Sequence, residues 1–295
     1  MPQEPWTPLT IIKTTADYLA GRGVEEPRLD AELLLSNVLG IDRIGLYTGF
    51  ERVLTGRELD HYRELVRQRA AGRPCKYITG RTEFYSIELA VDERSLIPRP
   101  ESEHVVERAL DVLGGRREED FALVVELGTG SGAIIIAVAA NAADAGFVAT
   151  DVSADALELA RSNAAAAGVA GKIEFVRGDL FDPLVVMGLE CRVDMLVSNP
   201  PYLSEKQWEC LPRSITGYEP REALVAGPNG TEVEERILEG ARLFLRPGGV
   251  IIMEIDPSQR DYLMTAASSF CEYGQVRFFA DYARRPRVME VEKKK

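Results

Sequence analysis

Apolar, strand-like runs alternate with helical segments from residue 121 onward, and this alternation constrains the fold more than any other feature. The run FALVVEL (121–127) is continuously apolar, as is typical of a strand buried on both faces of a parallel sheet. Similar runs recur at FVATD, KIEFV, VDMLVS and GVIIMEI, with helical patterns between them, and QVRFFA and RVMEV form a final antiparallel pair. The pattern predicts a doubly wound α/β sheet with an antiparallel last strand.

The chain before this region predicts a different architecture. Apolar residues recur at helical spacing after Pro27, and a second helix is expected at about 56–72. We therefore expect a small N-terminal helical domain over residues 1–75, a β-hairpin linker over 76–100 and the α/β domain over 101–295. The second helix and the turn after it carry an arginine-bearing side, which is either a solvated face or a docking surface: Arg57, Arg63, Arg67, Arg69 and Arg73.

Charge and composition exclude several classes of partner. The first 85 residues hold 12 basic and 12 acidic side chains, so the net charge of −12 lies in the rest of the chain. An acidic body disfavours duplex DNA or structured RNA as the main partner, because phosphate neutralisation dominates such affinities. No apolar run approaches the ~20 residues that span a bilayer. The two histidines and four scattered cysteines disfavour a zinc site and fit reduced thiols in a cytoplasmic protein.

Two of the predicted strands lead into residues suited to a nucleotide-like ligand. The motif ELGTGSGA (126–133) is a strand end followed by a glycine turn, in which Gly128, Gly130 and Gly132 let backbone come close to a ligand. Asp151 ends the next strand, where an acid can accept both ribose hydroxyls of a dinucleotide or of S-adenosyl-L-methionine (SAM).

The next two strands add an acid and an amide. Asp179 ends the third strand, where its carboxylate either takes an adenine amino group or belongs to an ordinary loop. The fourth strand ends in Asn199-Pro200-Pro201-Tyr202, a stiff exit with two neighbouring carbonyl acceptors, on Asn199 and Pro200, and one aromatic face. Such a set suits the two N–H bonds of a planar NH2 group. In an open α/β sheet all four strand ends meet at one edge, where ligands bind.

The chain resembles the PrmC/HemK family, the N(5)-glutamine methyltransferases that modify peptide chain release factors. The resemblance runs essentially end to end. It rests on RLDAELLL (28–35), GRPCKYITGRTEFYSIELAV (72–91), LIPRPESE (96–103), ELGTGSGA, SNPPY, YEPREAL (218–224) and DYARRPRVMEV (281–291). The pair IPRPESE and YEPREAL is far more specific than Asn-Pro-Pro-Tyr, which enzymes that methylate amino groups of DNA and RNA share. One departure is Leu180, where some members carry a tryptophan beside the adenine.

The resemblance implies a SAM-dependent methyltransferase (Rossmann-like) fold, with the glutamine of a Gly-Gly-Gln tripeptide as the acceptor and no metal. Asn199 and the Pro200 carbonyl would accept the two amide hydrogens, Tyr202 would pack against the amide plane, and the N-terminal helices would grip the release factor. SAM would be held by the motif residues and the later strand ends: Glu126, Gly128, Thr129, Gly130, Ser131, Gly132, Asp151, Asp179, Leu180 and Asn199.

Three alternatives stay open from the sequence. One is an amino methyltransferase acting on adenine in nucleic acid, which the acidic catalytic domain disfavours. Another is N(5)-glutamine methylation of a ribosomal protein, although that sister family usually has Ser-Pro where this chain has Pro100-Glu101. The third is a non-catalytic protein that binds SAM or a dinucleotide, for which Asn199-Pro200-Pro201-Tyr202 would have no use.

Overall fold

The computed structural model describes residues 5–115 and 121–295, which divide into two compact units. The first unit comprises the chain up to Arg81 together with 212–218, and the second comprises 82–211 together with 219–295. Nothing in the sequence analysis assigned the short segment 212–218 to the N-terminal helices. Tyr218 illustrates the assignment, because its hydroxyl donates to the Ala71 carbonyl at 3.5 Å within the first unit.

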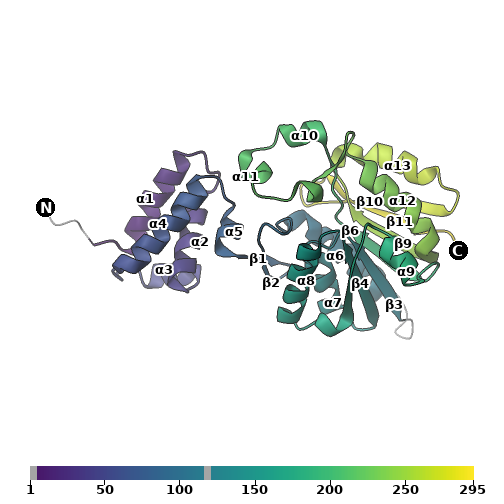
Figure 1. The fold of residues 1–295 in the computed structure, drawn as a ribbon, viewed down its shortest axis with the longest axis horizontal. Helices are drawn as coiled ribbons and strands as arrows, with labels where there is room; N and C mark the ends of the chain where they lie inside the picture. Colours follow the sequence, from purple (N-terminus) through teal and green to yellow (C-terminus); the bar gives the residue numbers. More distant parts are fainter. Residues whose placement is uncertain (1–4, 116–120) are drawn as a thin grey trace. The chain divides into compact units, whose positions relative to one another are not determined.

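The first unit is helical (Figure 1). It has its own apolar core. Capping boxes at Thr7 and Thr55 start the first and fourth helices by satisfying backbone N–H groups that the first turn leaves free. Leu19, Leu34, Leu35 and Tyr62 are fully buried between the helices. Its helices are α1 (Pro8–Ala20), α2 (Pro27–Leu39), α3 (Arg43–Thr48), α4 (Gly56–Ala70), α5 (Cys75–Thr79) and α11 (Arg213–Thr216).

The arginine-bearing side differs from the expectation at two positions, of which the first is Arg73, half-buried and donating through Nη1 to Gln68 Oε1 at 2.8 Å. Arg69 is turned inward, where its Nε donates to Asp30 Oδ2 at 2.6 Å, so it does not contribute to an exposed face. Arg63 and Arg67 are exposed, and each pairs with an acid three residues earlier, Asp60 at 3.2 Å and Glu64 at 2.8 Å. The exposed face is therefore mixed in charge rather than purely basic.

The second unit is built on a seven-stranded sheet in the order β10-β11-β9-β6-β3-β4-β5. The five strands from β9 to β5 are parallel, and β11 runs antiparallel to both of its neighbours, β9 and β10 (Figure 1). This confirms the predicted doubly wound sheet with an antiparallel last strand. The strands are β3 (Ala122–Leu127), β4 (Ala145–Asp151), β5 (Ile173–Arg177), β6 (Val193–Ser198), β9 (Leu245–Glu254), β10 (Tyr273–Ala280) and β11 (Pro286–Lys293).

Helices cover both faces of the sheet, and alternate strand residues belong to different cores. Val124 and Ile252 pack on the side of α6 and α7, whereas their neighbours Val125 and Ile251 pack on the side of α12 and α13. A strand buried on both faces explains why each predicted run was continuously apolar. The helices are α6 (Glu103–Gly114), α7 (Ala133–Asn141), α8 (Ala154–Ala166), α9 (Asp182–Val186), α10 (Glu205–Glu209), α12 (Glu232–Phe244) and α13 (Arg260–Ser268).

Short elements complete this unit. A hairpin of β1 (Arg81–Phe84) and β2 (Ile87–Ala90) lies inside the predicted linker segment, which begins with the helical turn of α5. Two further short strands, β7 (Leu203–Ser204) and β8 (Val225–Gly227), pair in parallel just after the Asn-Pro-Pro-Tyr exit. The 3₁₀ turns are η1 (Pro100–Ser102), η2 (Ala170–Lys172), η3 (Arg221–Ala223) and η4 (Pro257–Gln259). None of the helices in the described ranges combines the length and apolar character that a membrane span requires.

Glu234 is the most unusual buried group on α12, because it is fully buried and neither carboxyl oxygen has a hydrogen-bond partner among the described residues. Burial raises the pKa of Glu234 to about 8. The folded state therefore holds a proton that the unfolded chain releases at lower pH. Stability should accordingly fall as pH rises from the ordinary carboxyl range toward 8 and then level off.

We expect Glu234→Gln to remove this loss, because the amide stays neutral in the same space. The melting temperature of the variant should exceed that of the wild type at pH 8.5 and lie closer to it at pH 5.5. Each kcal/mol of recovered unfolding free energy should raise the melting temperature by about 2–4 °C. Thermal unfolding across this range is the measurement. Glu239→Gln, at an exposed position of the same helix, is the matched control, and equal behaviour of the two variants would contradict the assignment.

Candidate active site

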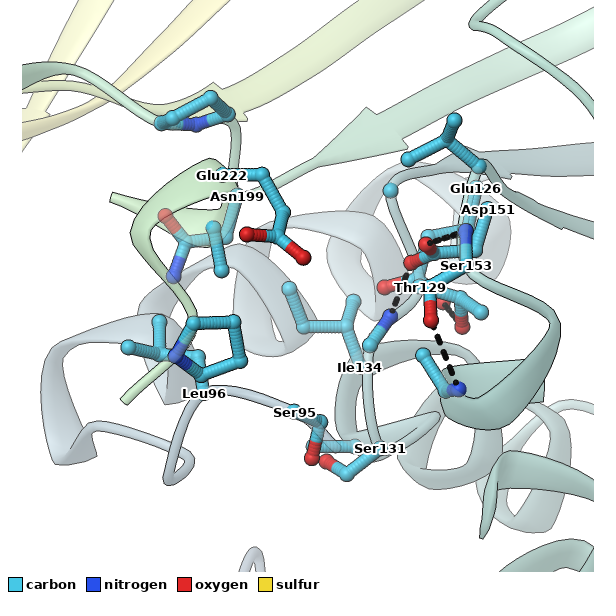
Figure 2. Close-up of a pocket in the computed structure, with 18 of the residues that line it drawn as sticks. Ser95, Leu96, Glu126, Thr129, Ser131, Ile134, Asp151, Ser153, Asn199 and Glu222 are labelled. Carbon is cyan, nitrogen blue, oxygen red and sulfur yellow. Dashed lines mark hydrogen bonds between the residues drawn. The ribbon is translucent and has the colours of Figure 1, made fainter. Parts of the chain in front are cut away.

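A cavity of about 210 Å³ opens where the carboxyl ends of β3, β4, β5 and β6 meet, entirely within the second unit. One water occupies roughly 30 Å³ in the liquid, so the cavity has room for a small molecule. The order of the strands reverses between β3 and β6, which is the switch point where ligands bind in such sheets. Figure 2 shows Asn199 and Glu222 on one side of the cavity and Glu126, Thr129 and Asp151 on the other.

The glycine turn after β3 forms one wall. Gly128 and Gly130 have φ values of +71° and +54°, which favour glycine. A Cβ on Gly128 would meet no protein atom within 4 Å, and one on Gly130 would approach only Ser95 Cβ, at 3.8 Å. Bare backbone therefore lines the cavity at these two positions.

Gly132 is a glycine for a different reason. A Cβ there would lie 2.8 Å from Ile136 Cδ1 and 3.2 Å from Ala160 Cβ, and Gly132 is not among the lining residues. The absence of a side chain lets the turn pack on α8, so packing already accounts for a glycine at this position, and the ligand contact expected of Gly132 stays a prediction. Thr129 and Ser131, between the glycines, do line the cavity.

Glu126 is the last acid of β3 and is almost completely buried. It accepts a short hydrogen bond from the Thr129 hydroxyl, which fixes the carboxyl against the turn (Figure 2). Burial raises the pKa of Glu126 to about 8. A positively charged ligand group in the cavity would favour the ionised carboxylate and so draw this pKa down.

Asp151 ends β4 and is held by backbone on both sides. Its Oδ2 accepts from the Gly130 N–H at 2.8 Å, and its Oδ1 accepts from the Ser153 N–H at 2.9 Å (Figure 2). Each oxygen keeps a further lone pair for a ligand hydroxyl. The structure thus brings the predicted glycine turn and the predicted acid into direct contact.

Asp179 and Leu180 follow β5 and also line the cavity. Asp179 is paired with Arg236 on α12, with 2.7 Å between Oδ2 and Nη2, a partner that the sequence analysis did not identify. Leu180 adopts a φ of +45°, which is unusual for a residue with a side chain. The ion pair spans one end of the cavity, while Leu180 offers it an apolar contact.

Asn199 leaves β6 with its amide fixed in one orientation. Its Nδ2 donates to Ser102 Oγ at 3.0 Å, and Oδ1 has no hydrogen-bond partner among the residues that the structure describes. Asn199 and Pro201 are among the residues that line the cavity, and Pro200 and Tyr202 are not. Burial raises the pKa of the half-buried Tyr202.

Other side chains at this edge were missed from the sequence. Gln259 Nε2 donates to the Tyr202 carbonyl at 2.9 Å and to the Gly230 carbonyl at 2.8 Å, which ties down the exit loop. Glu222 lines the cavity from η3, on the same side of the cavity as Asn199 (Figure 2). The signal for Glu222 was present, because it lies in YEPREAL, a motif that received no role.

The two most specific sequence motifs meet beside the cavity. Arg99 of IPRPESE donates through Nη2 to both oxygens of Glu219 of YEPREAL, at 2.6 and 2.8 Å. Glu219 is buried, so the pair is shielded from solvent on that side. Arg99 therefore fixes the segment that carries Glu222 into the cavity.

The charge of the cavity favours a cation. Four carboxyl groups and two arginines are among its lining residues: Glu126, Asp151, Asp179, Glu222, Arg94 and Arg236. Both arginines are already paired with aspartates, Arg94 with Asp92 at 2.7 Å and Arg236 with Asp179. The site thus combines a glycine turn, ribose-type acceptors, an excess of carboxylates and an oriented amide acceptor.

Sequence comparison assigns the chain to a family. It is 38% identical over 292 residues to the release factor glutamine methyltransferase of Rhodopirellula baltica, covering 98% of this chain and 97% of that relative. The chain belongs to the release factor glutamine methyltransferase family. The corresponding protein of Chlorobaculum tepidum is 45% identical over 258 residues, covering 86% and 87% of the two chains.

Family descriptions agree with this assignment, and solved structures share the fold of the second unit. The PrmC N-terminal domain family matches residues 10–80, and the methyltransferase small domain family matches 108–213. The catalytic domain of human METTL16 in complex with MAT2A 3′UTR hairpin 6 has a TM-score of 0.54 at 16% identity, covering 71% of this chain and 76% of that one. The N-terminal domain of human METTL16 in complex with SAH has a TM-score of 0.51 at 15% identity and the same coverage. At this identity the likeness concerns the fold alone.

Proposed function

We propose that this enzyme transfers a methyl group from SAM to the side-chain amide nitrogen of the glutamine in the Gly-Gly-Gln motif of peptide chain release factors. The observation that carries the proposal is the oriented amide of Asn199, whose NH2 is engaged by Ser102 while Oδ1 remains available as an acceptor. Membership of the family supports the choice of glutamine over other planar NH2 groups.

The residues around the cavity fit SAM as the methyl donor. Side chains at Gly128 and Gly130 would occupy the space where backbone now lines the cavity. Asp151 suits the ribose hydroxyls, and Glu126 and Glu222 suit the positive charges of the molecule. Asp179 and Leu180 would hold the adenine, with Arg236 fixing the Asp179 carboxylate. When bound, SAM supplies a methyl group that its sulfonium makes strongly electrophilic.

The chain's own residues make the acceptor nitrogen reactive. An amide nitrogen is a poor nucleophile because its lone pair is delocalised into the carbonyl. Asn199 Oδ1 and the Pro200 carbonyl would each accept a hydrogen bond from one of the two amide N–H groups. These hydrogen bonds would raise the electron density on the nitrogen and hold its out-of-plane lobe toward the methyl donor. One of these protons leaves to solvent as the N–C bond forms. Tyr202 would lie against the amide plane.

We expect Asp151→Ala to weaken SAM binding by about 1–3 kcal/mol, since two hydrogen bonds to the ligand are lost. Calorimetric titration with SAM is the measurement, and added chelator should not change the dissociation constant. Asp155→Ala, at an exposed position in the first turn of α8, is the matched control. Retention of full affinity by the Asp151 variant would remove this residue from the site.

The acceptor is tested by offering the alternatives side by side. Labelled SAM should transfer its methyl group to intact release factor, and not to an adenine-containing oligonucleotide or to a ribosomal protein. Labelling of the oligonucleotide alone would favour the adenine methyltransferase, and SAM binding with no transfer would favour a non-catalytic protein. A release factor substrate also places the enzyme in the cytoplasm, where termination of translation occurs.

The first unit is proposed as the module that recognises the body of the release factor. A tripeptide on a loop offers few contacts, so the cavity cannot by itself distinguish the protein that carries it. Binding energy from a remote surface would then help to position the glutamine for reaction. Arg63 and Arg67, both exposed on α4, are candidates for such a surface.

A further inference from the structure

Three side chains from separate elements form a continuous series of hydrogen bonds that starts at the wall of the cavity, where Asn199 and Ser102 are lining residues. Asn199 Nδ2, after β6, donates to Ser102 Oγ at 3.0 Å, and Ser102 Oγ, in η1, donates to Glu254 Oε2 at 2.6 Å at the end of β9. Ser102 and Glu254 are 3% and 1% exposed, so water does not replace these contacts. This series of hydrogen bonds ends at the Asn199 amide, which is proposed to bind the glutamine that accepts the methyl group.

The chemistry of the three groups gives this series of hydrogen bonds a direction. An ionised carboxylate can only accept, so Ser102 must give its single hydroxyl proton to Glu254. The hydroxyl then has only lone pairs to offer Asn199, and the Asn199 NH2 is the group that donates to it. Oδ1 is thereby turned to the other side, where an acceptor N–H can reach it.

We propose that Ser102 is a positioning residue through which ionised Glu254 fixes the orientation of the Asn199 amide. This inference rests on the proposed function, because the orientation matters only if Oδ1 accepts a hydrogen from the substrate. Ser102 does not touch the reacting atoms.

Protonation of Glu254 would reverse this series of hydrogen bonds. A neutral carboxyl can donate to Ser102 Oγ, whose own proton is then free to bond to Asn199 Oδ1, so the amide turns over. The Asn199 NH2 group would then face the NH2 group of the substrate glutamine, and the substrate would lose its hydrogen-bond acceptor Oδ1. Turnover should therefore fall at acidic pH as Glu254 gains a proton.

The surroundings of Glu254 determine where that fall occurs. Arg287 on β11, Arg99 and the Ser102 hydroxyl favour the ionised carboxylate, whereas Glu101 opposes it, and the Tyr202 phenol is also nearby. Burial outweighs these effects and raises the pKa of Glu254 above the ordinary carboxyl range. In a plot of kcat against pH, the fall on the acidic side (the acidic limb) should therefore occur at a higher pH than the titration of an exposed glutamate would give.

Substitution of Ser102 separates this role from a purely structural one. Ser102→Ala should lower kcat on release factor at least tenfold and leave the SAM dissociation constant within about twofold of the wild-type value. The acidic limb should disappear, because the hydrogen bonds that connect Asn199 to Glu254 are lost. Ser102→Thr keeps the hydroxyl and should restore most of kcat together with the limb. Ser102→Cys, with a weakly bonding thiol, serves if the alanine variant does not fold. Ser36→Ala, at a buried serine of α2, is the matched control.

A measurement without substrate keeps this test independent of the proposed function. The side-chain NH2 resonance of Asn199 in a ¹⁵N spectrum, assigned by its loss in Asn199→Ala, should shift between pH 8 and pH 5 in the wild type and stay constant in Ser102→Ala. Failure of methyl transfer together with this pattern would overturn the function and leave the inference standing. An unchanged kcat in Ser102→Ala, or a resonance with the same pH response in both proteins, would overturn the inference.

Discussion

Asn199→Ala is expected to lose at least about 100-fold in turnover while SAM still binds with the affinity of the wild type. The loss follows because a preorganised polar contact to the reacting group disappears, and such deletions cost about 10²–10³ in kcat. The substitution removes Oδ1, the proposed hydrogen-bond acceptor for the substrate amide, whereas the other residues proposed to hold SAM lie at the ends of other strands. Single-turnover assays on release factor, with SAM affinity measured in parallel, give the two numbers.

The aspartate variant sharpens this experiment. Asn199→Asp keeps an oxygen toward the substrate, but it places a second carboxylate on Ser102, whose only proton is donated to Glu254. We expect turnover nearly as low as in the alanine variant. Asn141→Ala, at the end of α7 and outside the cavity, is the matched control. Turnover of Asn199→Ala within tenfold of the wild type would refute the role of this amide.

Removal of residues 1–81, which form all of the first unit except 212–218, is the second change with a large expected effect. A chain starting at Thr82, once shown to be folded, should bind SAM but methylate intact release factor with a much lower kcat/KM. On a short Gly-Gly-Gln peptide its activity should be poor and similar to that of the full enzyme, because the peptide lacks the remote surface. Comparison of both acceptors in steady-state assays separates recognition from chemistry.

Charge reversal tests the same idea in the intact chain. Arg63→Glu with Arg67→Glu should reproduce part of the loss on release factor and change nothing on the peptide. Lys13→Glu with Arg22→Glu alters the charge of the first unit equally, at exposed positions of α1 and of the turn after it, and is the matched control. A folded truncated enzyme that modifies intact release factor as efficiently as the full chain would show that the docking role is wrong.

The parts of the site that follow local rules were predictable from the sequence. The glycine turn and Asp151 each come directly after a buried strand, so alternation of strands and helices was enough to bring them to one edge. The Gly130 N–H to Asp151 contact shows how closely they meet. The continuous apolar runs likewise predicted the parallel sheet, because both of its faces are covered.

The partners of these residues could not be predicted, because they depend on packing between distant segments. Ser102 is 97 positions from Asn199 and 152 from Glu254. Arg236 meets Asp179 across 57 positions, and Arg69 turns inward to Asp30 across 39. No periodicity links such pairs, so a hydroxyl in IPRPESE or an arginine on a helix face carries no sign of its partner. Gly132 is a further case, since the sequence motif gave no sign that Ile136 and Ala160 leave no room for a side chain there.

The position of the transferred methyl group tests the central claim most directly. After incubation of release factor with enzyme and SAM, tandem mass spectrometry of the Gly-Gly-Gln peptide should find one methyl group on the glutamine side-chain nitrogen. A release factor with that glutamine replaced by alanine should remain unmodified. A methyl group at another residue, or on adenine in a companion oligonucleotide while the glutamine stays unmodified, would contradict the account.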